Sequence, residues 1–319
     1  MHNQPLQRVL VTGAAGFIGS HLCAALASRG IHILAADLPN ASWWRHDELH
    51  LHIERIPSDL TQPGAADSLL TAGPFDCIFH LAALVDVERA PELVLTCVHA
   101  NITSTAALLY AARGRARRVL IVGTCEEYGN GPVPFTESQR EIAVSPYSWS
   151  KICTTHLAQL YAHIFDLPTV IARPFLTYGP LQINNMLIPA AIRAALRHEP
   201  LPITPGQQTR DLVYVTDVVE GIIAAATAPN LLGQIINLGS GVETSIAYLV
   251  TLIYELCQSR AKPAIGARPY RPGETMHFFC SPQRARQLLN WSPRVTLREG
   301  LQHTIDWFRA HPHLLQTSP

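Results

Sequence analysis

Charge of either sign is scarce in this sequence. Charged residues make up 15% of the 319 positions, and 24 basic residues balance 24 acidic ones, which gives a formal net charge of zero. A protein whose main partner is nucleic acid or an anionic membrane surface usually carries a positive excess, so the composition argues against both partners. A local basic pocket is still compatible with this balance. Hydrophobic residues reach 48%, which is typical of a globular chain with a substantial core.

Cysteine pairs, a leader segment and a long apolar run are also missing. The chain has no C-x-x-C pair, and its seven cysteines are scattered, at positions 23, 77, 97, 125, 153, 257 and 280. This usage is typical of a reduced, cytoplasmic protein. The N-terminus enters RVLVTGAAGFIG without a charged and then apolar leader. No apolar run approaches the roughly eighteen residues needed to span a bilayer, so we expect no membrane partner.

Metal-ligand spacing is absent as well. The fifteen histidines are dispersed along the chain. The closest group, His46, His50 and His52, has no cysteine or carboxylate partner at ligand spacing. We therefore expect no metal site.

Short apolar runs alternate with longer helical patterns through the first half of the chain. This alternation predicts βαβ units and a parallel sheet. The stretch NASWWRHDEL, where a further helix would fit, is predicted to be a loop. The predicted fold is α/β, a Rossmann-type doubly wound parallel sheet. Its strands are expected at 8–12, 31–36, 52–56, 77–80, 119–123 and 169–172, and its helices near 17–29, 91–113 and 146–165.

After residue 173 the pattern changes. Turn formers in RPFLTYGP and HEPLPITPG flank a helix near 188–197. The strands in RDLVYV and QIINLG predict that the chain returns to the sheet between about 211 and 239, and helical patterns at 246–257, 282–289 and 297–309 follow. We expect residues 1–173, with these return segments, to form an NAD-binding Rossmann domain. Residues 174–319 are then mainly a smaller, interleaved substrate-binding lobe.

A glycine-rich turn, VTGAAGFIGSHL, joins the first predicted strand to the first helix. Its Gly13, Gly16 and Gly19 stand three residues apart. Glycines permit a tight turn and close approach of the backbone to a pyrophosphate, for which the helix N-terminus supplies amide donors. Asp37 follows Gly19 by 18 residues, at the end of the second strand. A carboxylate there can accept hydrogen bonds from both ribose hydroxyls of NAD and repels the extra phosphate of NADP.

Other positions near the predicted NAD site carry weaker signals. Phe17 and Ile18 begin the helix beside the glycines. Asp59 and Leu60 follow the third strand and could contact the adenine, although Asp59 is equally suited to capping a helix. The small residues of HLAAL, after the fourth strand, could let the cofactor pass close by, and simple tight packing explains them equally well. The cofactor positions predicted in this segment are Leu81, Ala82 and Ala83.

The segment YSWSK places Tyr147 and Lys151 at i and i+4, on one face of a helix. An ammonium group beside a phenol favours the phenolate, so we expect the pKa of Tyr147 to fall toward neutrality. The phenol can then take the proton from a sugar hydroxyl as hydride leaves the same carbon, and Lys151 can hydrogen-bond the nicotinamide ribose. Thr124, 23 residues before Tyr147 at the tip of the fifth strand, can orient the same substrate oxygen.

An ordered set of motifs resembles the extended short-chain dehydrogenases/reductases, in particular the nucleotide-sugar epimerase/dehydratase family. The motifs are TGAAGFIG, DL, HLAA, T-x-x-x-YG, YSWSK, RPF-x-x-YGP, TRDLVYVTDV, LGSG, RPGE and LNWSP, from residue 12 to about 293. The resemblance implies NAD, a nucleotide-sugar substrate and a catalytic triad of Thr124, Tyr147 and Lys151. It also implies a structural role for Asn101 and a homodimer that pairs through the helices near 91–113 and 146–165.

The triplet Thr124-Cys125-Glu126 is similar to the TDE and TSE triplets of sugar 4,6-dehydratases, and nucleotide-glucuronate decarboxylases use a TSE-like form. In dehydratases the Glu removes the C5 proton beside a transient 4-ketone, and a neighbouring acid helps hydroxide leave C6. The resemblance makes Glu126 the base and Cys125, a weaker acid than Asp, the proton donor. TCE also resembles 5,6-dehydratases of nucleoside-antibiotic pathways. Glu127 is expected to be a solvated or arginine-paired carboxylate.

The second half of the chain supplies the predicted substrate contacts. Arg210 and Arg271 match family positions that clamp the nucleotide pyrophosphate, a task that suits guanidinium forks. Tyr178 and Asn185 are expected to line the sugar and nucleotide pocket. Leu176 stands where the family usually has an Asn that contacts a substrate phosphate.

These observations predict an NAD-retaining enzyme that oxidises a nucleotide sugar at C4 and then eliminates water, as a 4,6- or 5,6-dehydratase. The alternatives are a 4-epimerase, a nucleotide-glucuronate decarboxylase and an NAD(P)H-dependent reductase of 4-keto-6-deoxy sugars. A redox sensor that binds NAD without turnover is disfavoured, because Thr124, Tyr147 and Lys151 are all present.

Overall fold

The fold is built on a parallel β-sheet, seen in a computed structural model that describes residues 5–183 and 186–315. The strand order is β11-β6-β5-β4-β1-β2-β3. The order reverses between β1 and β4, and doubly wound sheets bind their ligands beyond the carboxyl ends of the strands at this point. The strands are β1 (Arg8–Thr12), β2 (His32–Asp37), β3 (Glu54–Pro57), β4 (Cys77–His80), β5 (Val119–Val122), β6 (Thr169–Pro174) and β11 (Ile235–Leu238).

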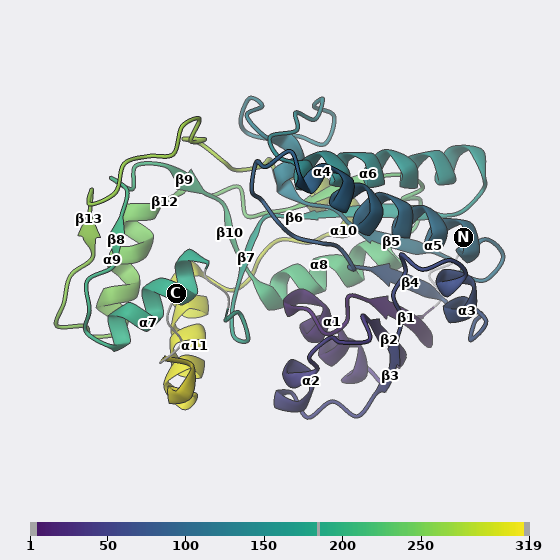
Figure 1. Cartoon of the computed structure of the whole chain (residues 1–319), viewed down its shortest axis with the longest axis horizontal. Helices are drawn as coiled ribbons and strands as arrows, with labels where there is room; N and C mark the ends of the chain where they lie inside the picture. Colours follow the sequence, from purple (N-terminus) through teal and green to yellow (C-terminus); the bar gives the residue numbers. More distant parts are fainter. Residues whose placement is uncertain (1–4, 184–185, 316–319) are drawn as a thin grey trace.

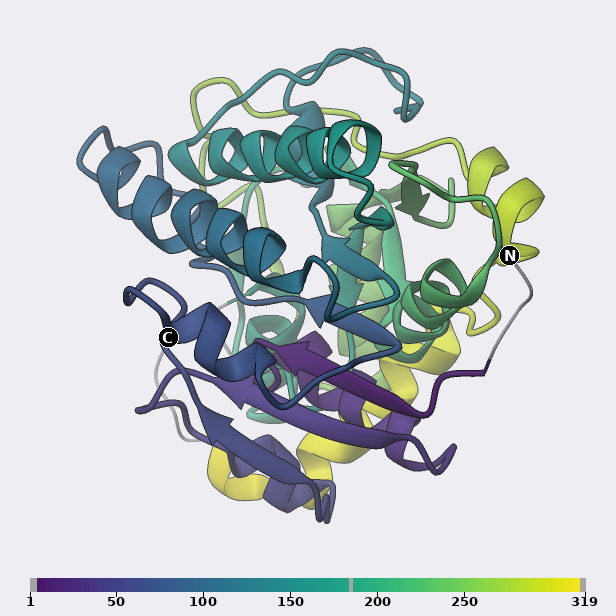
Figure 2. The ribbon, with the colours of Figure 1, turned by 90° about the vertical axis from the view of Figure 1, so that its right-hand side faces the viewer.

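Helices cover both faces of the sheet (Figures 1 and 2). One face carries α1 (Phe17–Ala27), α8 (Val215–Thr227) and α10 (Gln283–Leu289), and the other carries α3 (Ala65–Leu70), α5 (Ser104–Ala112) and α6 (Pro146–Ile164). Successive side chains of a strand point to opposite faces. Val9 and Val11 therefore enter the first core, with α1 and α8, whereas Leu10 enters the second, with α5 and α6.

One long helix runs from Leu93 to Ala112, as α4 (Leu93–Cys97), the π-helical turn η1 (Val98–Thr103) and α5. The helix has 20 residues. An eighteen-residue stretch of it has a mean hydropathy of 1.4 and is one third buried, so the helix meets the length and composition of a membrane span. The sequence analysis predicted a helix near 91–113 but found no apolar run of this length, because polar residues such as Asn101 interrupt the apolar ones. Asn101 is buried, accepts from the amide of Leu84 at 2.7 Å and donates to the hydroxyl of Ser150 at 2.8 Å. The helix is thus fastened to α6 and to the loop that follows β4.

The remaining elements gather at the other end of the molecule, on the left of Figure 1. There α7 (Leu187–Leu196), α9 (Ile246–Leu256) and α11 (Leu297–Ala310) enclose a third core. Short strand pairs accompany these helices outside the main sheet. These pairs are β10 (Leu212–Tyr214) with β7 (Leu176–Tyr178), β12 (Thr244–Ser245) with β9 (Thr209–Arg210), and β13 (Ala264–Ile265) with β8 (Pro202–Ile203).

Two expectations about local structure are wrong. The segment NASWWRHDEL contains a short helix, α2 (Trp44–Glu48), instead of a continuous loop. The strand in RDLVYV does not return to the main sheet, because β10 pairs with β7 in a sheet of its own. The return is made by β11, which pairs in parallel with β6.

Candidate active site

The glycine-rich turn between β1 and α1 has no room for side chains. Gly13 has a φ of +70°, and a Cβ atom there would lie 2.6 Å from the backbone nitrogen of Ala82. A Cβ at Gly19 would overlap the carbonyl oxygen of Gly13. Gly16 is the N-cap of α1. The turn therefore lies tightly against the Leu81–Ala82 backbone and leaves the amides at the start of α1 for a ligand.

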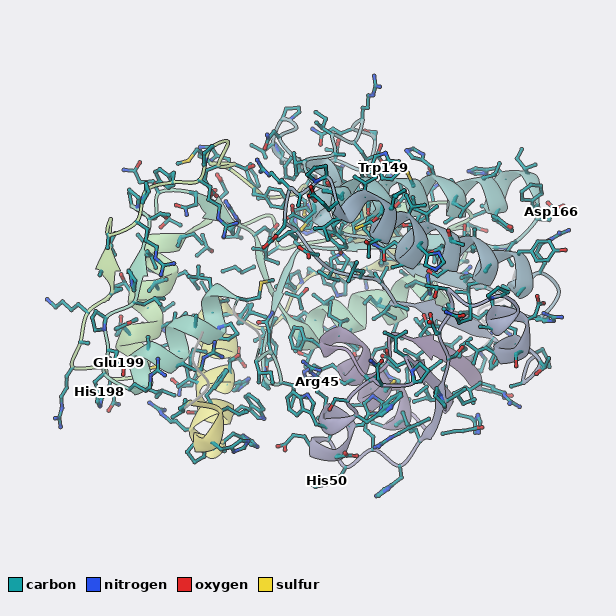
Figure 3. All side chains as sticks on the ribbon, in the orientation of Figure 1. Arg45, His50, Trp149, Asp166, His198 and Glu199 are labelled. Atoms are coloured by element: carbon teal, nitrogen blue, oxygen red, sulfur yellow. The ribbon has the colours of Figure 1, made fainter. Side chains whose placement is uncertain are left out.

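Asp37 lies beside this turn at the carboxyl end of β2. Its carboxylate accepts hydrogen bonds from the amides of Ala15 and Leu38, each at 2.8 Å. Behind the turn, α2 contributes two donors that the sequence analysis missed. His46 contacts the carbonyl of Ala14 at 2.7 Å, and Arg45 donates to that of Ala15 at 3.2 Å. Arg45, labelled in Figure 3, also donates to the carbonyl of Leu181 at 3.1 Å, so it links the turn to the second half of the chain.

The other predicted cofactor positions surround the turn with different roles. Asp59 accepts from the amide and the hydroxyl of Thr61, at 3.0 and 2.7 Å, and these hydrogen bonds lower its pKa. Asp59 does not cap a helix, because α3 begins at Ala65 with Gly64 as its N-cap. Leu60 is buried in the second core, and Ile18 packs against the first. Phe17 contacts the ring of His21 edge-on.

Thr124, Tyr147 and Lys151 meet where β5 ends against α6. Thr124 directly follows β5 and is the N-cap of η2 (Cys125–Tyr128), a short 3-10 helix. Tyr147 and Lys151 lie in the first turns of α6, which Ser145 caps and Pro146 begins. A hydrogen bond joins the Tyr147 phenol to Thr124, and Nζ of Lys151 donates to the carbonyl of Val122 at 2.7 Å. All three side chains are buried.

Burial changes the protonation of this triad in a direction that corrects one expectation. It raises the pKa of Tyr147, and the hydrogen bond with Thr124 opposes this rise, whereas the nearby carboxylates of Glu126 and Glu127 add to it. The expected fall toward neutrality is therefore wrong for the protein by itself, because one ammonium does not outweigh desolvation. Burial also lowers the pKa of Lys151 to about 8, against the attraction of Glu127.

Glu126 lines a pocket of about 730 Å³. Arg210 and Arg271 line the same pocket, as predicted for a substrate clamp, and so does Arg89 from the loop after β4. Burial raises the pKa of the Glu126 carboxyl, while Arg210 and Arg89 oppose the rise. The pocket thus holds a carboxyl group that can take up a proton among three cationic side chains.

The three arginines are held differently. Arg210 donates to Glu274 at 2.5 Å and to the carbonyl of Thr275 at 2.9 Å, which fixes its guanidinium at the pocket wall. Arg271 and Arg89 are exposed. The sequence analysis missed Arg89. The sequence signal for Arg89 was its position shortly after β4. The carboxyl ends of parallel strands face the same edge of the sheet, so residues that follow them can reach one site.

Cys125, the proton donor that the resemblance implies, is a buried core residue. All seven cysteines fall within the described residues and are free thiols, and Cys125 packs into the first core with Tyr128 and Phe135. Burial raises its pKa well above the usual value, and Glu126 and Asp211 add to the effect. A thiol that is held protonated so firmly is a poor proton donor, so the catalytic assignment of Cys125 is corrected.

Tyr178 and Asn185 are the other two residues predicted to line the substrate pocket. Tyr178 is 2% exposed, packs in the third core and donates from its hydroxyl to the carbonyl of Leu297 at 3.3 Å. It therefore supports α11 and is not placed to line a sugar pocket. Asn185 lies outside the described residues. Glu127 is paired with an arginine, Arg173, at 2.6 Å, which was one of its two expected states.

The fold and the site together define a dinucleotide-binding enzyme of the Rossmann class with a Thr-Tyr-Lys centre. The model of the NAD dependent epimerase/dehydratase family matches residues 9–239, and the chain belongs to this family. Its members and relatives are NAD-dependent enzymes that modify nucleotide sugars.

Curated relatives with different activities have similar identities. A UDP-N-acetyl-alpha-D-glucosaminuronate decarboxylase of Bacillus cytotoxicus is 34% identical, over 95% of this chain and 98% of that protein. A dTDP-glucose 4,6-dehydratase of Xanthomonas campestris is 30% identical, over 96% and 94%. Among solved structures, the UDP-glucuronic acid 4-epimerase of Bacillus cereus with UDP-glucuronic acid and NAD has a TM-score of 0.87 and 30% identity, over 96% of this chain and all of that one. Overall similarity therefore does not separate the three reactions.

Proposed function

We propose that this enzyme retains NAD, oxidises C4 of a nucleoside-diphosphate sugar and then eliminates water from the 4-keto sugar. One observation carries the proposal. Glu126, which can take up a proton, faces the pocket only two residues from Thr124, and Thr124 is hydrogen-bonded to Tyr147. A base on the residue two positions after Thr124 lies near the oxidation centre and can act on the carbon next to the new ketone.

The residues present fit an NAD cofactor. The space at Gly13 and Gly19, which a Cβ atom would fill, allows a pyrophosphate to approach the start of α1, and Asp37 is in place for the ribose hydroxyls. When bound, NAD would supply the acceptor for the hydride of C4 and, after elimination, the donor that returns this hydride to C6, while a proton returns to C5. The product would then differ from the substrate by one water. The positively charged ring of NAD would also favour the Tyr147 phenolate.

The chain's own residues supply the proton transfers. Thr124 orients the sugar hydroxyl, and Tyr147 takes its proton, with the Lys151 ammonium nearby stabilising the negative oxygen. The 4-ketone makes the C5 proton acidic, and Glu126 removes it. The carboxyl group so formed can return this proton to the hydroxide that leaves C6. One carboxyl group then serves both steps, and the buried Cys125 is not required.

Decarboxylation of a nucleotide uronate is the second candidate, and the three arginines of the pocket favour it. Two of them, Arg210 and Arg271, suffice for a diphosphate, whereas Arg89 adds a third cation near Glu126 that suits a sugar carboxylate. A 4-keto uronate is a β-keto acid, which loses carbon dioxide without an added acid. The similarity to the decarboxylase of Bacillus cytotoxicus supports this candidate equally.

The proposed active form is a homodimer. Its support is an exposed apolar surface on the outer side of α4, α5 and α6, which includes Leu95 (78% exposed), Tyr110 (63%) and Ile164 (64%). Trp149, labelled at the outer edge of α6 in Figure 3, belongs to the same surface. Monomers rarely leave such a continuous apolar surface in water.

Incubation with UDP-, dTDP-, GDP- and CDP-sugars, followed by mass spectrometry, tests the reaction. Loss of one water supports dehydration, loss of carbon dioxide supports decarboxylation, and unchanged mass with inverted C4 stereochemistry supports epimerisation. Released NAD is measured after denaturation of the purified protein, and its absence would contradict retention. Y147F should lose turnover by a factor of about 10² to 10⁴. Y248F, at an exposed tyrosine of α9, is the matched control and should stay active.

A further inference from the structure

A fully buried ion-pair chain lies directly behind the catalytic centre. Glu127 and Arg173 each have side chains with 0% exposure and are joined at 2.6 Å. Arg173 also contacts Glu141 at 2.7 Å, and its guanidinium lies 4.8 Å from the ring centre of Tyr128. A buried pair of this kind gains little net stability over apolar residues, because both charges lose their hydration. The buried pair is therefore expected to have a role other than stabilising the fold.

Glu127 holds the backbone that presents Thr124. One oxygen of its carboxylate accepts from the Thr124 amide at 2.9 Å. The other accepts from the hydroxyl of Thr155 at 2.8 Å and from Arg173. A single carboxylate thus ties the end of β5 to α6 and to β6. A Cβ atom at Gly123 would lie 2.5 Å from the first oxygen, so glycine at this position makes room for the carboxylate.

The same carboxylate lies close to the catalytic lysine. Thr155 follows Lys151 by one helical turn, so both side chains leave α6 on the side that Glu127 contacts. The titratable groups that interact with Lys151 are Glu127 from η2 and His80 from β4. His80 bonds Thr12 and Thr105, and burial lowers its pKa to about 3, so it is neutral. Glu127 is then the negative charge that this lysine faces.

We infer that Glu127 is a positioning residue of the active site, which fixes Thr124 at the end of β5 and supplies the counter-charge of Lys151. This inference rests on the proposed function for its catalytic meaning. Glu127 is not among the described residues that line the pocket. It acts through Thr124 and Lys151.

The chain offers an unusually clean measurement, because its sequence contains two lysines, Lys151 and Lys262. In protein labelled with ¹³C and ¹⁵N lysine, the two ammonium groups give separate NMR signals, and the exposed Lys262 is an internal reference. In E127Q the Lys151 signal should titrate at a pH lower by about 1 than in the wild type, with Lys262 unchanged. E141Q is the matched control, since it also removes a carboxylate from Arg173 but leaves Thr124 and Thr155 bonded to Glu127. It should leave Lys151 unchanged.

Kinetics test the second half of the inference. E127Q should lower kcat by at least tenfold with little change in KM, and the alkaline limb of its pH profile should move to lower pH together with the NMR titration. E127D retains the charge and should restore the Lys151 titration. An unchanged Lys151 titration in E127Q, or an equal shift in E141Q, would overturn the inference.

Folding of E127Q is a separate matter, because the variant leaves Arg173 with one carboxylate partner. The double variant E127Q/R173M removes both buried charges and should fold. Lys151 should titrate below its wild-type pH in this variant too, and a titration at or above the wild-type pH would contradict the role of Glu127. If the wild type oxidises no nucleotide sugar, the proposed function fails, whereas the lysine titration still decides this inference.

Discussion

Lys151 donates a hydrogen bond from Nζ to the backbone carbonyl of Val122, at 2.7 Å, across the junction of α6 and β5. The bond holds the almost fully buried ammonium group of Lys151 beside Val122, which precedes Thr124 by two residues. Burial lowers the pKa of Lys151 to about 8, although Glu127 opposes the change. The charge that the Tyr147 phenolate needs is therefore itself sensitive to pH near neutrality.

Activity should decline on the alkaline side of about pH 8. The ammonium form of Lys151 is present below this pH and is lost above it, so kcat/KM should fall as the pH rises through about 8. Rates measured from pH 6 to pH 10 with the substrate found in the sugar panel check this. A profile that stays level up to pH 10 would show that turnover does not require the charge on Lys151.

The variant K151M should be inactive but more stable. The usual pKa of lysine, 10.5, applies to the unfolded chain, and the folded value is about 8. The unfolded state therefore binds more protons between these values, so stability rises with pH in this window. Below pH 8 the buried charge costs up to about 3 kcal/mol. In urea unfolding, K151M should exceed the wild type at pH 7, and the difference should shrink toward pH 10.5. Equal stability of the two proteins at pH 7 would contradict this cost.

Glu126 should separate oxidation from elimination. In E126Q, oxidation at C4 should proceed, because Thr124, Tyr147 and Lys151 are intact, while exchange of the C5 proton with D₂O should stop. Mass spectrometry of the recovered sugar measures both the exchange and the loss of water. E88Q, an exposed carboxylate at the same pocket, is the control and should exchange normally. Exchange at the wild-type rate in E126Q would assign the base to another residue.

Cys125 should be dispensable for chemistry. C125A removes a buried thiol from the first core, so we expect a loss of about 1 to 2 kcal/mol in unfolding free energy with turnover within about threefold of the wild type. C153A, on the half-buried side of α6, controls for the loss of a thiol elsewhere. A loss of a hundredfold or more in kcat in a folded C125A protein would restore the thiol as a proton donor.

The sequence predicts the first half of the fold well because its signals are local. Apolar runs, the glycine turn and the Ser145-Pro146 helix start each act within a few residues, and β1 and β4 fall at their predicted bounds. The strand in RDLVYV shows where this fails. Its pattern is that of a strand in any sheet, and its pairing with β7 rather than β6 depends on packing between distant segments.

The residues of the site also divide into those that a local sequence pattern predicts and those that depend on the folded structure. The spacing of Tyr147 and Lys151 follows from one helix, so a sequence pattern reveals it. The roles of Cys125 and Glu126 depend on the 3-10 turn η2, which directs the first side chain into the core and the second into the pocket. Glu127 and Arg173 are 46 residues apart, and a single sequence contains no signal that joins them.

The outer surface of α4, α5 and α6 should mediate dimer formation. On α6 the exposed residues Trp149, Leu160 and Ile164 recur at helical spacing, so they form one stripe beside the exposed Leu95 of α4. An arginine in the centre of this stripe would be buried without a partner in a dimer, and this is costly. L160R should therefore shift the protein to a monomer in sedimentation experiments. L288R, at a leucine of similar exposure (42%) on α10, should leave the dimer intact, because α10 covers the opposite face of the sheet. A wild-type protein that sediments as a monomer at micromolar concentration would refute the proposed assembly, and the exposed apolar stripe would then need another occupant.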